Sequence, residues 1–353
     1  MKKVDYIIVG FGLAAISFCE ILERHNKSFV VFYDGRNSSS KISGGLYNPV
    51  ILKRFTLCWN ATQQLEKALP MFRRLEKKFQ NNFDEKIPVL RKFASIEEQN
   101  EWFIASDKPS LSSFLFSEII KNNNPSINAS FGLGKVMHTG KMDVSKLMDC
   151  YQKHLEDKHC LIEKRFEYDK IDLSEEKITY ENYTASKIIF AEGFGLKKNP
   201  FFNDLPLDGN KGELLLIKAS DLKLDYILKS SVFLIPQGND LYTVGATYNF
   251  NDKDVNTTKK AKEELLEKLS KLINCDFEII DHFAGIRPTV LDRRPLVGLH
   301  EKHQNLAVLN GLGTRGVMIG PTVAENLFNH LENDSPLNPE IDIKRFYRKR
   351  KIN

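Results

Sequence analysis

The first 34 residues alternate apolar and polar segments in the order strand, turn, helix, strand. Residues 4–9 form a short apolar run rich in Ile and Val, which glycine then interrupts. Apolar residues at helical spacing continue to about His25, and a second apolar run over 29–33 stops at Asp34. This order predicts the opening of a βαβ unit, and a parallel sheet that takes further strands from later in the chain.

Later segments contain both helical and strand patterns. Helical spacing of apolar residues predicts helices over 60–80, 96–104, 112–121, 143–155, 257–273 and 322–332, the last opened by a capping box from Thr322 to Glu325. Apolar runs predict strands over 160–167 and 187–190, and antiparallel strands over 214–217, 232–235 and 241–244. We therefore expect an α/β protein in which a mixed β-sheet domain with helices is inserted into a parallel-sheet domain.

Length and composition indicate two domains, and they argue against a nucleic-acid-binding role from charge alone, a metal site and a membrane partner. A chain of 353 residues exceeds what one hydrophobic core usually covers. The net charge of +5 is too small by itself to imply nucleic acid, and none of the eight histidines has metal-ligand spacing, so no metal is expected. Five cysteines without a CxxC pair are typical of reduced thiols in a cytoplasmic protein. No apolar stretch approaches the ~20 residues that span a bilayer, so no membrane partner is expected.

A glycine-rich fingerprint lies between the first predicted strand and the first predicted helix. Its six residues follow the pattern G-x-G-x-x-A and are Gly10, Phe11, Gly12, Leu13, Ala14 and Ala15. Gly10 permits a tight turn, Gly12 lets the backbone approach a pyrophosphate, and Ala15 keeps the helix close to the sheet. Asp34, 22 residues after Gly12, is placed to bind a ribose. The pattern predicts a Rossmann-like dinucleotide site and leaves NAD and FAD both open; the alternative is a glycine turn and an acid that bind no nucleotide.

Further short motifs follow in a fixed order along the chain. They are Gly44 to Pro49, Met142-Asp143, Ile188 to Gly193, Gly245-Ala246-Thr247, Gly285 to Pro288 with Asp292, Pro295 to Gly298, and Gly313 to Gly316 with Pro321. In this order and spacing they resemble the D-amino acid oxidase (DAO) family of FAD-dependent oxidoreductases, which includes oxidases of glycine and sarcosine and a tRNA-modifying oxidase. The segments 60–135 and 250–280 match little beyond length.

The resemblance implies a fold, a cofactor and the residues that hold it. An FAD-binding domain would comprise 1–60, 136–205 and 281–353, and a substrate domain 61–135 and 206–280. FAD would be held non-covalently, with Gly44 and Gly45 approaching the flavin and its phosphates, and Ala191 and Gly193 over the adenine half. The residues expected to face the isoalloxazine ring are Gly313, Gly316, Val317 and Met318.

The resemblance also implies substrate residues. Arg287 matches the arginine that holds a substrate carboxylate, a task that suits the guanidinium fork; a structural ion pair with Asp292 is the alternative. Arg315, Tyr47 and Tyr248 are candidates to line the pocket. Arg315 and the Gly44–Tyr47 loop favour the tRNA-modifying branch of the family.

We therefore expect oxidation of the C–N bond of a carboxylate-bearing amine, with molecular oxygen as the final acceptor. The amine is either a small molecule, such as glycine or sarcosine, or the modified wobble uridine of tRNA. An NAD-dependent dehydrogenase and a flavin-binding protein without turnover stay open as other classes. The basic run 344–351, interleaved with two aromatics, is either an RNA contact or a solvated tail.

Overall fold

The computed structural model describes residues 1–36, 38–173 and 177–350, and these form two compact units. The first unit consists of Met1–Ser43, Val144–Asn210 and Ile286–Asn353, and the second of Gly44–Asp143 and Lys211–Gly285. Residues 44–60 and 136–143 belong to the second unit, whereas the sequence pattern grouped both segments with the FAD-binding domain. The loop that carries Gly44 and Gly45 therefore packs within the second unit.

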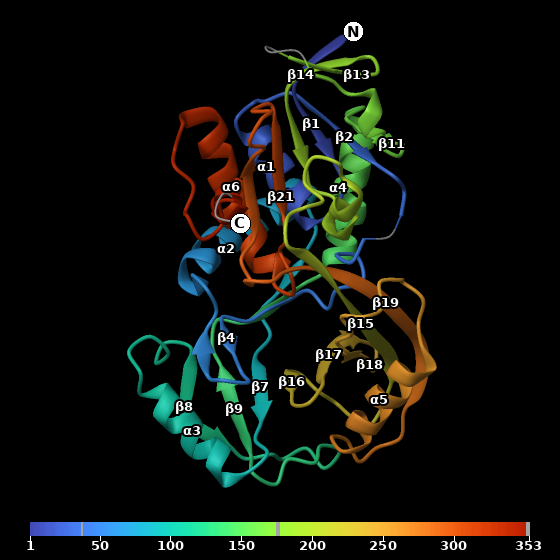
Figure 1. Cartoon of the computed structure of the whole chain (residues 1–353). Coiled ribbons are helices and arrows are strands. Elements are labelled where there is room, and N and C mark those ends of the chain that lie inside the picture. Colours follow the sequence, from blue (N-terminus) through green and yellow to red (C-terminus); the bar gives the residue numbers. More distant parts are fainter. Residues whose placement is uncertain (37, 174–176, 351–353) are drawn as a thin grey trace. The chain divides into compact units, whose positions relative to one another are not determined.

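The first unit is built on a sheet whose central strands are parallel. These strands are β1 (Lys2–Val9), β2 (Phe29–Tyr33), β11 (Leu161–Glu163), β14 (Tyr183–Phe190) and β21 (Leu306–Asn310), and β1 lies between β2 and β14 (Figure 1). Three antiparallel strands complete the sheet, β12 (Asp172–Leu173), β13 (Ile178–Tyr180) and β20 (Leu296–Leu299). The βαβ opening predicted from the sequence is confirmed, and all five parallel strands present their carboxyl ends at one edge.

Helices of the first unit pack on the sheet because β1 alternates its buried side chains between two faces. Ile7 and Val9 join one core cluster, while Tyr6 on the opposite face lies 5.6 Å from the ring of Phe18. Phe18 belongs to α1 (Leu13–Arg24), which packs against α6 (Gly316–Asn333), and α4 (Val144–Asp157) bonds to the end of α1 through Tyr151 and Glu23. The remaining helical segments are the short η1 (Tyr168–Lys170) and η2 (Gly193–Lys198), and α7 (Lys344–Arg350).

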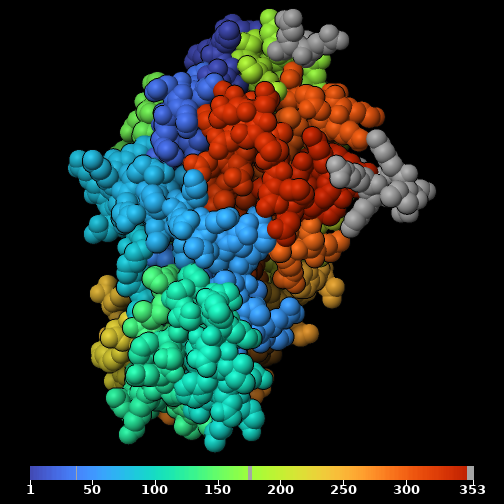
Figure 2. All heavy atoms as spheres, turned by 90° about the vertical axis from the view of Figure 1, so that its left-hand side faces the viewer, coloured from blue at the N-terminus to red at the C-terminus, as the bar shows by residue number. Residues whose placement is uncertain are grey.

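The second unit centres on an eight-stranded sheet. Its order is β19-β15-β18-β17-β16-β7-β9-β8, with bounds Glu278–Val290, Leu207–Lys218, Leu241–Gly245, Phe233–Gly238, Ile227–Lys229, Val89–Lys92, Leu133–Val136 and Leu115–Ile120. Smaller sheets join β3 (Leu46–Tyr47), β10 (Gly140–Met142) and β6 (Asp84–Glu85), and β4 (Val50–Ile51) with β5 (Thr56–Leu57). Its helices are α2 (Ala61–Phe79), α3 (Ile96–Ser106) and α5 (Lys259–Ser270). Figure 2 shows α6 at the surface of the first unit and α3 at the surface of the second.

Two expected elements are wrong. The helix expected over 112–121 is strand β8, because its Ile119 and Ile120 pair with β9 in an antiparallel ladder. The capping box is also wrong: α6 begins at Gly316, and Thr322 lies inside the helix. The capping-box pattern misled the expectation, since Thr322 and Glu325 both lie within α6, as does Pro321. The helices expected over 60–80, 96–104, 143–155 and 257–273 are confirmed.

Candidate cofactor and substrate site

The turn after β1 brings its backbone against the end of β14. Gly10 has φ +102°, and a Cβ on it would lie 2.5 Å from the carbonyl oxygen of Ala191. The amide of Gly10 donates to the Phe32 carbonyl at 2.8 Å, which fixes the turn between β1 and β2. Only glycine fits this position, because both the backbone conformation and the space exclude a side chain.

The N-terminus of α1 follows this turn. Gly12 is the N-cap residue, makes no side-chain cap and is followed by a first turn without acidic residues. Ser40 lies beside it, and its Oγ accepts from the Leu13 amide at 3.3 Å. Ala14 and Ala15 are buried, while Phe11 packs its ring 5.6 Å from that of Tyr33. Free amides and the positive end of the helix dipole here suit the phosphates of a dinucleotide.

Asp34 lies at the carboxyl end of β2, as the sequence predicts. Its carboxylate accepts from Nε of Arg36 at 2.6 Å and from the Arg36 amide at 3.2 Å. Burial pushes the pKa of Asp34 upward, but the hydrogen bonds from Arg36 outweigh it and hold the pKa below its usual value. Asp34 is therefore an ionised acceptor at this edge of the sheet.

Glu192 adds a second carboxyl group at the same edge. The sequence motifs did not single out this residue. It follows β14, accepts from Asn199 Nδ2 at 2.8 Å and from the hydroxyl of Tyr168. Burial raises the pKa of Glu192 to about 7; both donors lower it, and the charge of Asp34 raises it. The motif Ile188 to Gly193 contained this residue, but its burial depends on packing with η1 and η2.

A second glycine-rich loop leads from β21 into α6. Gly313 has φ +60° and open space where a Cβ would be, and its amide donates to the Pro288 carbonyl at 3.0 Å. A Cβ on Gly316 would lie 3.3 Å from Leu13 Cδ1, so α6 begins close to α1. Both helices thus begin at the carboxyl edge of the parallel sheet, and their positive ends favour negative charge there.

Other predicted residues of the first unit lie at this same edge. Ala191 is buried, and its amide donates to the Val9 carbonyl at 2.8 Å. Gly193 has φ +57° with open space at its Cβ position, and its carbonyl accepts from Asn310 Nδ2 at 3.0 Å. Val317 and Met318 are buried in the first turn of α6, so their side chains pack inward.

The two arginines predicted to bind substrate come from neighbouring segments of the first unit. Arg287 precedes Pro288, whose carbonyl bonds to Gly313, and Arg315 is the N-cap residue of α6. Asp292, the acid considered as an alternative partner for Arg287, pairs with Arg345 at 2.8 Å.

The first part of the basic run 344–351 is folded into the first unit. Arg345 pairs with Asp292 and stacks over the ring of Phe346 at 4.2 Å, and Tyr347 is buried. These residues are therefore not a solvated tail, while Lys351 lies outside the described residues.

In the second unit, packing accounts for three predicted residues. A Cβ on Gly45 would lie 1.8 Å from the Met142 carbonyl oxygen, and one on Gly44 would lie 2.6 Å from Ile235 Cδ1. The hydroxyl of Tyr47 donates to Asp84 Oδ1 at 2.7 Å, and burial raises the pKa of this tyrosine far above its usual value. Contact of these residues with flavin or substrate stays a prediction.

A buried lysine anchors the loop that follows β18. Lys211 is 1% exposed, and its Nζ binds Asp252 at 2.5 Å and Asp254 at 2.7 Å. Its backbone also pairs with Asn249, whose neighbour Tyr248 is 60% exposed. Charged residues spaced in this way gave no motif in the sequence, and only the antiparallel bridge brings them together.

The described residues fit a dinucleotide cofactor. The start of α1, the close approach that Gly10 and Gly12 permit, and the acid at the end of β2 define a dinucleotide-binding α/β protein. Among the residues that the structure describes, no group of three or more His, Cys, Asp or Glu side chains could hold a metal ion. No helix in this part of the chain is long and apolar enough to cross a membrane.

Comparison with known families assigns this class. The family model described as FAD dependent oxidoreductase matches residues 5–329, and the chain therefore belongs to the DAO family. It is an FAD-dependent oxidoreductase, and the resemblance drawn from its motifs is confirmed.

Individual relatives match parts of the chain. The tRNA 5-methylaminomethyl-2-thiouridine biosynthesis bifunctional protein MnmC of Idiomarina loihiensis is 26% identical over 155 residues, covering 41% of this chain and 25% of that protein. Glycine oxidase of Pseudomonas putida is 26% identical over 139 residues, covering 38% of each chain. The chain thus matches about a quarter of the bifunctional protein's length.

Solved structures share the fold over nearly the whole chain. Glycine oxidase from Geobacillus kaustophilus has a TM-score of 0.79 at 16% identity, covering 96% of this chain and 97% of that one. Iminodiacetate oxidase from Chelativorans sp. BNC1 has a TM-score of 0.77 at 14% identity, covering 95% and 98%. At these identities the likeness establishes the fold alone.

Proposed function

We propose that this enzyme oxidises the C–N bond of an N-carboxymethyl amine, and that the amine is carried on the wobble uridine of tRNA. The observation that carries the carboxylate part is Arg315. This arginine is partly buried at the start of α6, and its guanidinium has no acidic partner among the described residues. A cation so placed favours a substrate carboxylate, and Arg287 lies on the segment that bonds to the same loop.

The reaction follows from the chemistry of such a substrate. FAD, held non-covalently by the start of α1 and by Asp34, would accept a hydride from the α-carbon and pass the electrons to molecular oxygen. The substrate nitrogen loses its proton, water adds to the resulting imine, and the C–N bond breaks to give an amine and an oxo acid. Arg287 and Arg315 would hold the carboxylate and orient the C–H bond, and such orientation lowers the barrier.

The tRNA part rests on the relatives. The bifunctional proteins that match this chain are named for biosynthesis of a modified tRNA uridine. Glycine oxidase of Pseudomonas putida favours the second candidate, a small amino acid. An anaerobic titration of the purified flavoprotein with hypomodified tRNA, glycine and sarcosine separates them. Bleaching of the flavin by tRNA alone supports the proposal, and bleaching by free amino acids alone refutes its tRNA part.

Arginine variants test the carboxylate part. Arg315→Ala removes a charge-assisted hydrogen bond of about 1.5–3 kcal/mol, so we expect KM to rise about 10- to 100-fold. Arg294→Ala is the matched control, because that arginine pairs with Glu340 at the surface. Equal KM values in Arg315→Ala and in the wild type would show that this guanidinium does not bind the substrate.

A further inference from the structure

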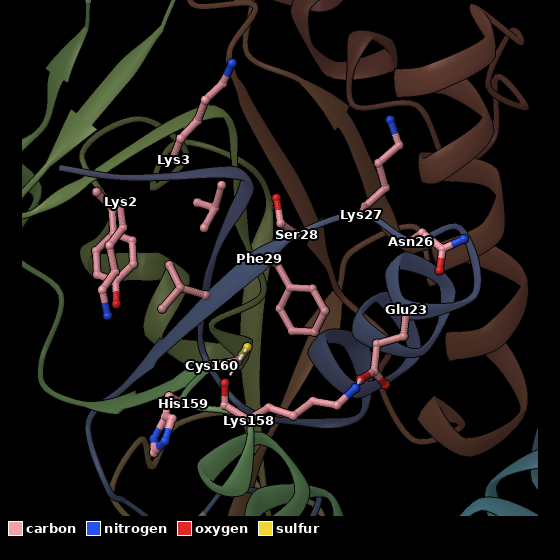
Figure 3. A pocket seen from close by; sticks show the side chains of 13 residues that line it. Lys2, Lys3, Glu23, Asn26, Lys27, Ser28, Phe29, Lys158, His159 and Cys160 are labelled. Atoms are coloured by element: carbon pink, nitrogen blue, oxygen red, sulfur yellow. Dashed lines mark hydrogen bonds and ion pairs between the residues drawn. The ribbon is translucent and has the colours of Figure 1, made fainter.

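The amino ends of the parallel strands surround a pocket of about 630 Å³ in the first unit. It is formed by the beginning of β1, the turn after α1, the beginning of β2, the turn after α4 and the beginning of β14 (Figure 3). Gly10, Asp34 and Gly193 lie after the opposite ends of these strands. The pocket is therefore separate from the proposed cofactor site, and the eight residues of β1 set the two edges about 26 Å apart.

The pocket is lined by cations that come from three separate segments. Its lining lysines are Lys2, Lys3, Lys27 and Lys158, and Glu23 is the acid among its lining residues. Glu23 is already engaged, since it accepts from Lys158 Nζ at 2.5 Å and bonds His154 Nε2 at 2.8 Å. Figure 3 shows the side chain of Lys158 reaching Glu23. The side chains of Lys2 and Lys3 extend in opposite directions, and neither reaches Glu23.

Local structure explains two of these lysines but not the other two. Lys27 and Lys158 follow the ends of α1 and α4, where cations stabilise the helix dipole, and Lys27 also pairs with Glu332. Lys2 and Lys3 begin a strand and form no ion pair in the described part of the chain. Asp5 lies nearby, but its carboxylate is occupied by the amide and hydroxyl of Ser28, each at 2.7 Å.

We propose that this pocket binds phosphate groups of a tRNA backbone, resting on the proposed function above. Ammonium groups bind phosphates as point charges, and lysines from three segments around one hollow suit a chain of phosphates, which meets separate cations along its length. A ligand whose reacting group lies at the carboxyl edge must span about 26 Å to reach these lysines, given the length of β1. Free amino acids are far too small for this, whereas a folded RNA is large enough.

Lysine footprinting of the holoenzyme tests the placement without any substitution. Acetylation is followed by mass spectrometry with no ligand, with tRNA, and with ATP as a free-phosphate probe. We expect tRNA to protect Lys2 and Lys3 but not Lys259 and Lys260, two lysines at the start of α5 in the second unit. Protection by ATP without protection by tRNA would assign the pocket to a free nucleotide and overturn the RNA assignment.

A double variant that removes two positive charges gives the quantitative test. Lys2→Gln with Lys3→Gln removes two phosphate contacts, so the slope of log K against log salt falls by about 1.8. Between 50 and 200 mM salt, the wild type should then lose about 12-fold more tRNA affinity than this variant. Lys259→Gln with Lys260→Gln carries the same change of charge and should keep the wild-type slope; an unchanged slope in the Lys2 and Lys3 variant overturns the inference.

These outcomes separate the pocket from the reaction. If tRNA bleaches the flavin but leaves Lys2 and Lys3 unprotected, the pocket assignment fails and the proposed function stands. If the lysines are protected but no tRNA bleaches the flavin, the proposed reaction fails and the pocket stands. A tRNA that neither binds nor reduces refutes both.

Discussion

Replacing Glu192 by glutamine should stabilise the protein above neutral pH and leave it unchanged in mild acid. Burial raises the pKa of Glu192 to about 7 in the folded state, against 4.5 for an ordinary glutamate. Between these two values the unfolded chain has released the proton while the folded chain retains it. Stability contributed by this group is therefore fully present below about pH 4.5 and declines as the pH rises toward 7.

The magnitude follows from the size of the shift. A difference of about 2.5 pH units at 1.36 kcal/mol each amounts to about 3 kcal/mol, lost by the wild type between mild acid and pH 8. Glutamine is neutral at every pH and has nearly the same shape, so Glu192→Gln lacks this loss. We expect nearly equal unfolding free energies at about pH 4, and an advantage of up to about 3 kcal/mol for the variant at about pH 8.

Urea unfolding followed by far-ultraviolet circular dichroism, at constant excess FAD, measures the difference at each pH. Glu167→Gln is the control, because Glu167 is exposed and its pKa is lowered by the hydrogen bond from Lys170. That control should gain nothing above pH 7. A difference between Glu192→Gln and the wild type that is the same at both pH values would show that Glu192 ionises normally.

Three further variants test the turn at Gly10 and the loop that Lys211 anchors. Gly10→Ala places a Cβ 2.5 Å from the Ala191 carbonyl in a left-handed backbone, so we expect purified protein with little bound flavin, measured by the ratio of flavin to protein absorbance. Lys211→Met should lower the thermal midpoint less than Asp252→Asn with Asp254→Asn, because the double variant leaves a buried ammonium group with Glu213, at 4.0 Å, as its remaining acid. The reverse order of midpoints in that pair would refute the view that the lysine is held by these two acids.

The strand–turn–helix–strand opening could be predicted because its information is local. The backbone needs of the turn at Gly10 and the acid at the end of the next strand are written in consecutive residues. The family motifs extended this to the cofactor, since their order along the chain carries information that a single motif lacks. The start of the last helix was wrong because the capping-box pattern of Thr322 to Glu325 also occurs inside α6, where it caps nothing.

Glu192 and Lys211 show what sequence reasoning could not reach. The environment of Glu192 depends on Tyr168 and Asn199, 24 and 7 residues away, and neither spacing has a recognisable period. Lys211 meets its acids about 40 residues later only because an isolated bridge pairs it with Asn249. Both are buried titratable groups whose neighbours are set by tertiary packing, which a one-dimensional pattern does not contain.

The pocket at the amino edge could be predicted from the sequence only in part. Once parallel strands are expected to begin near residues 4, 29 and 160, the residues just before them must gather at one edge, because parallel strands begin side by side. Lys2, Lys3, Lys27 and Lys158 all precede or begin such strands. Their position at one edge was therefore implicit in the predicted topology, and what the sequence lacked was the strand order that makes β1, β2, β11 and β14 neighbours. In a predicted parallel sheet, lysines that precede the strands therefore indicate a candidate anion site at the amino edge, just as glycines that follow the strands indicate a nucleotide site at the carboxyl edge.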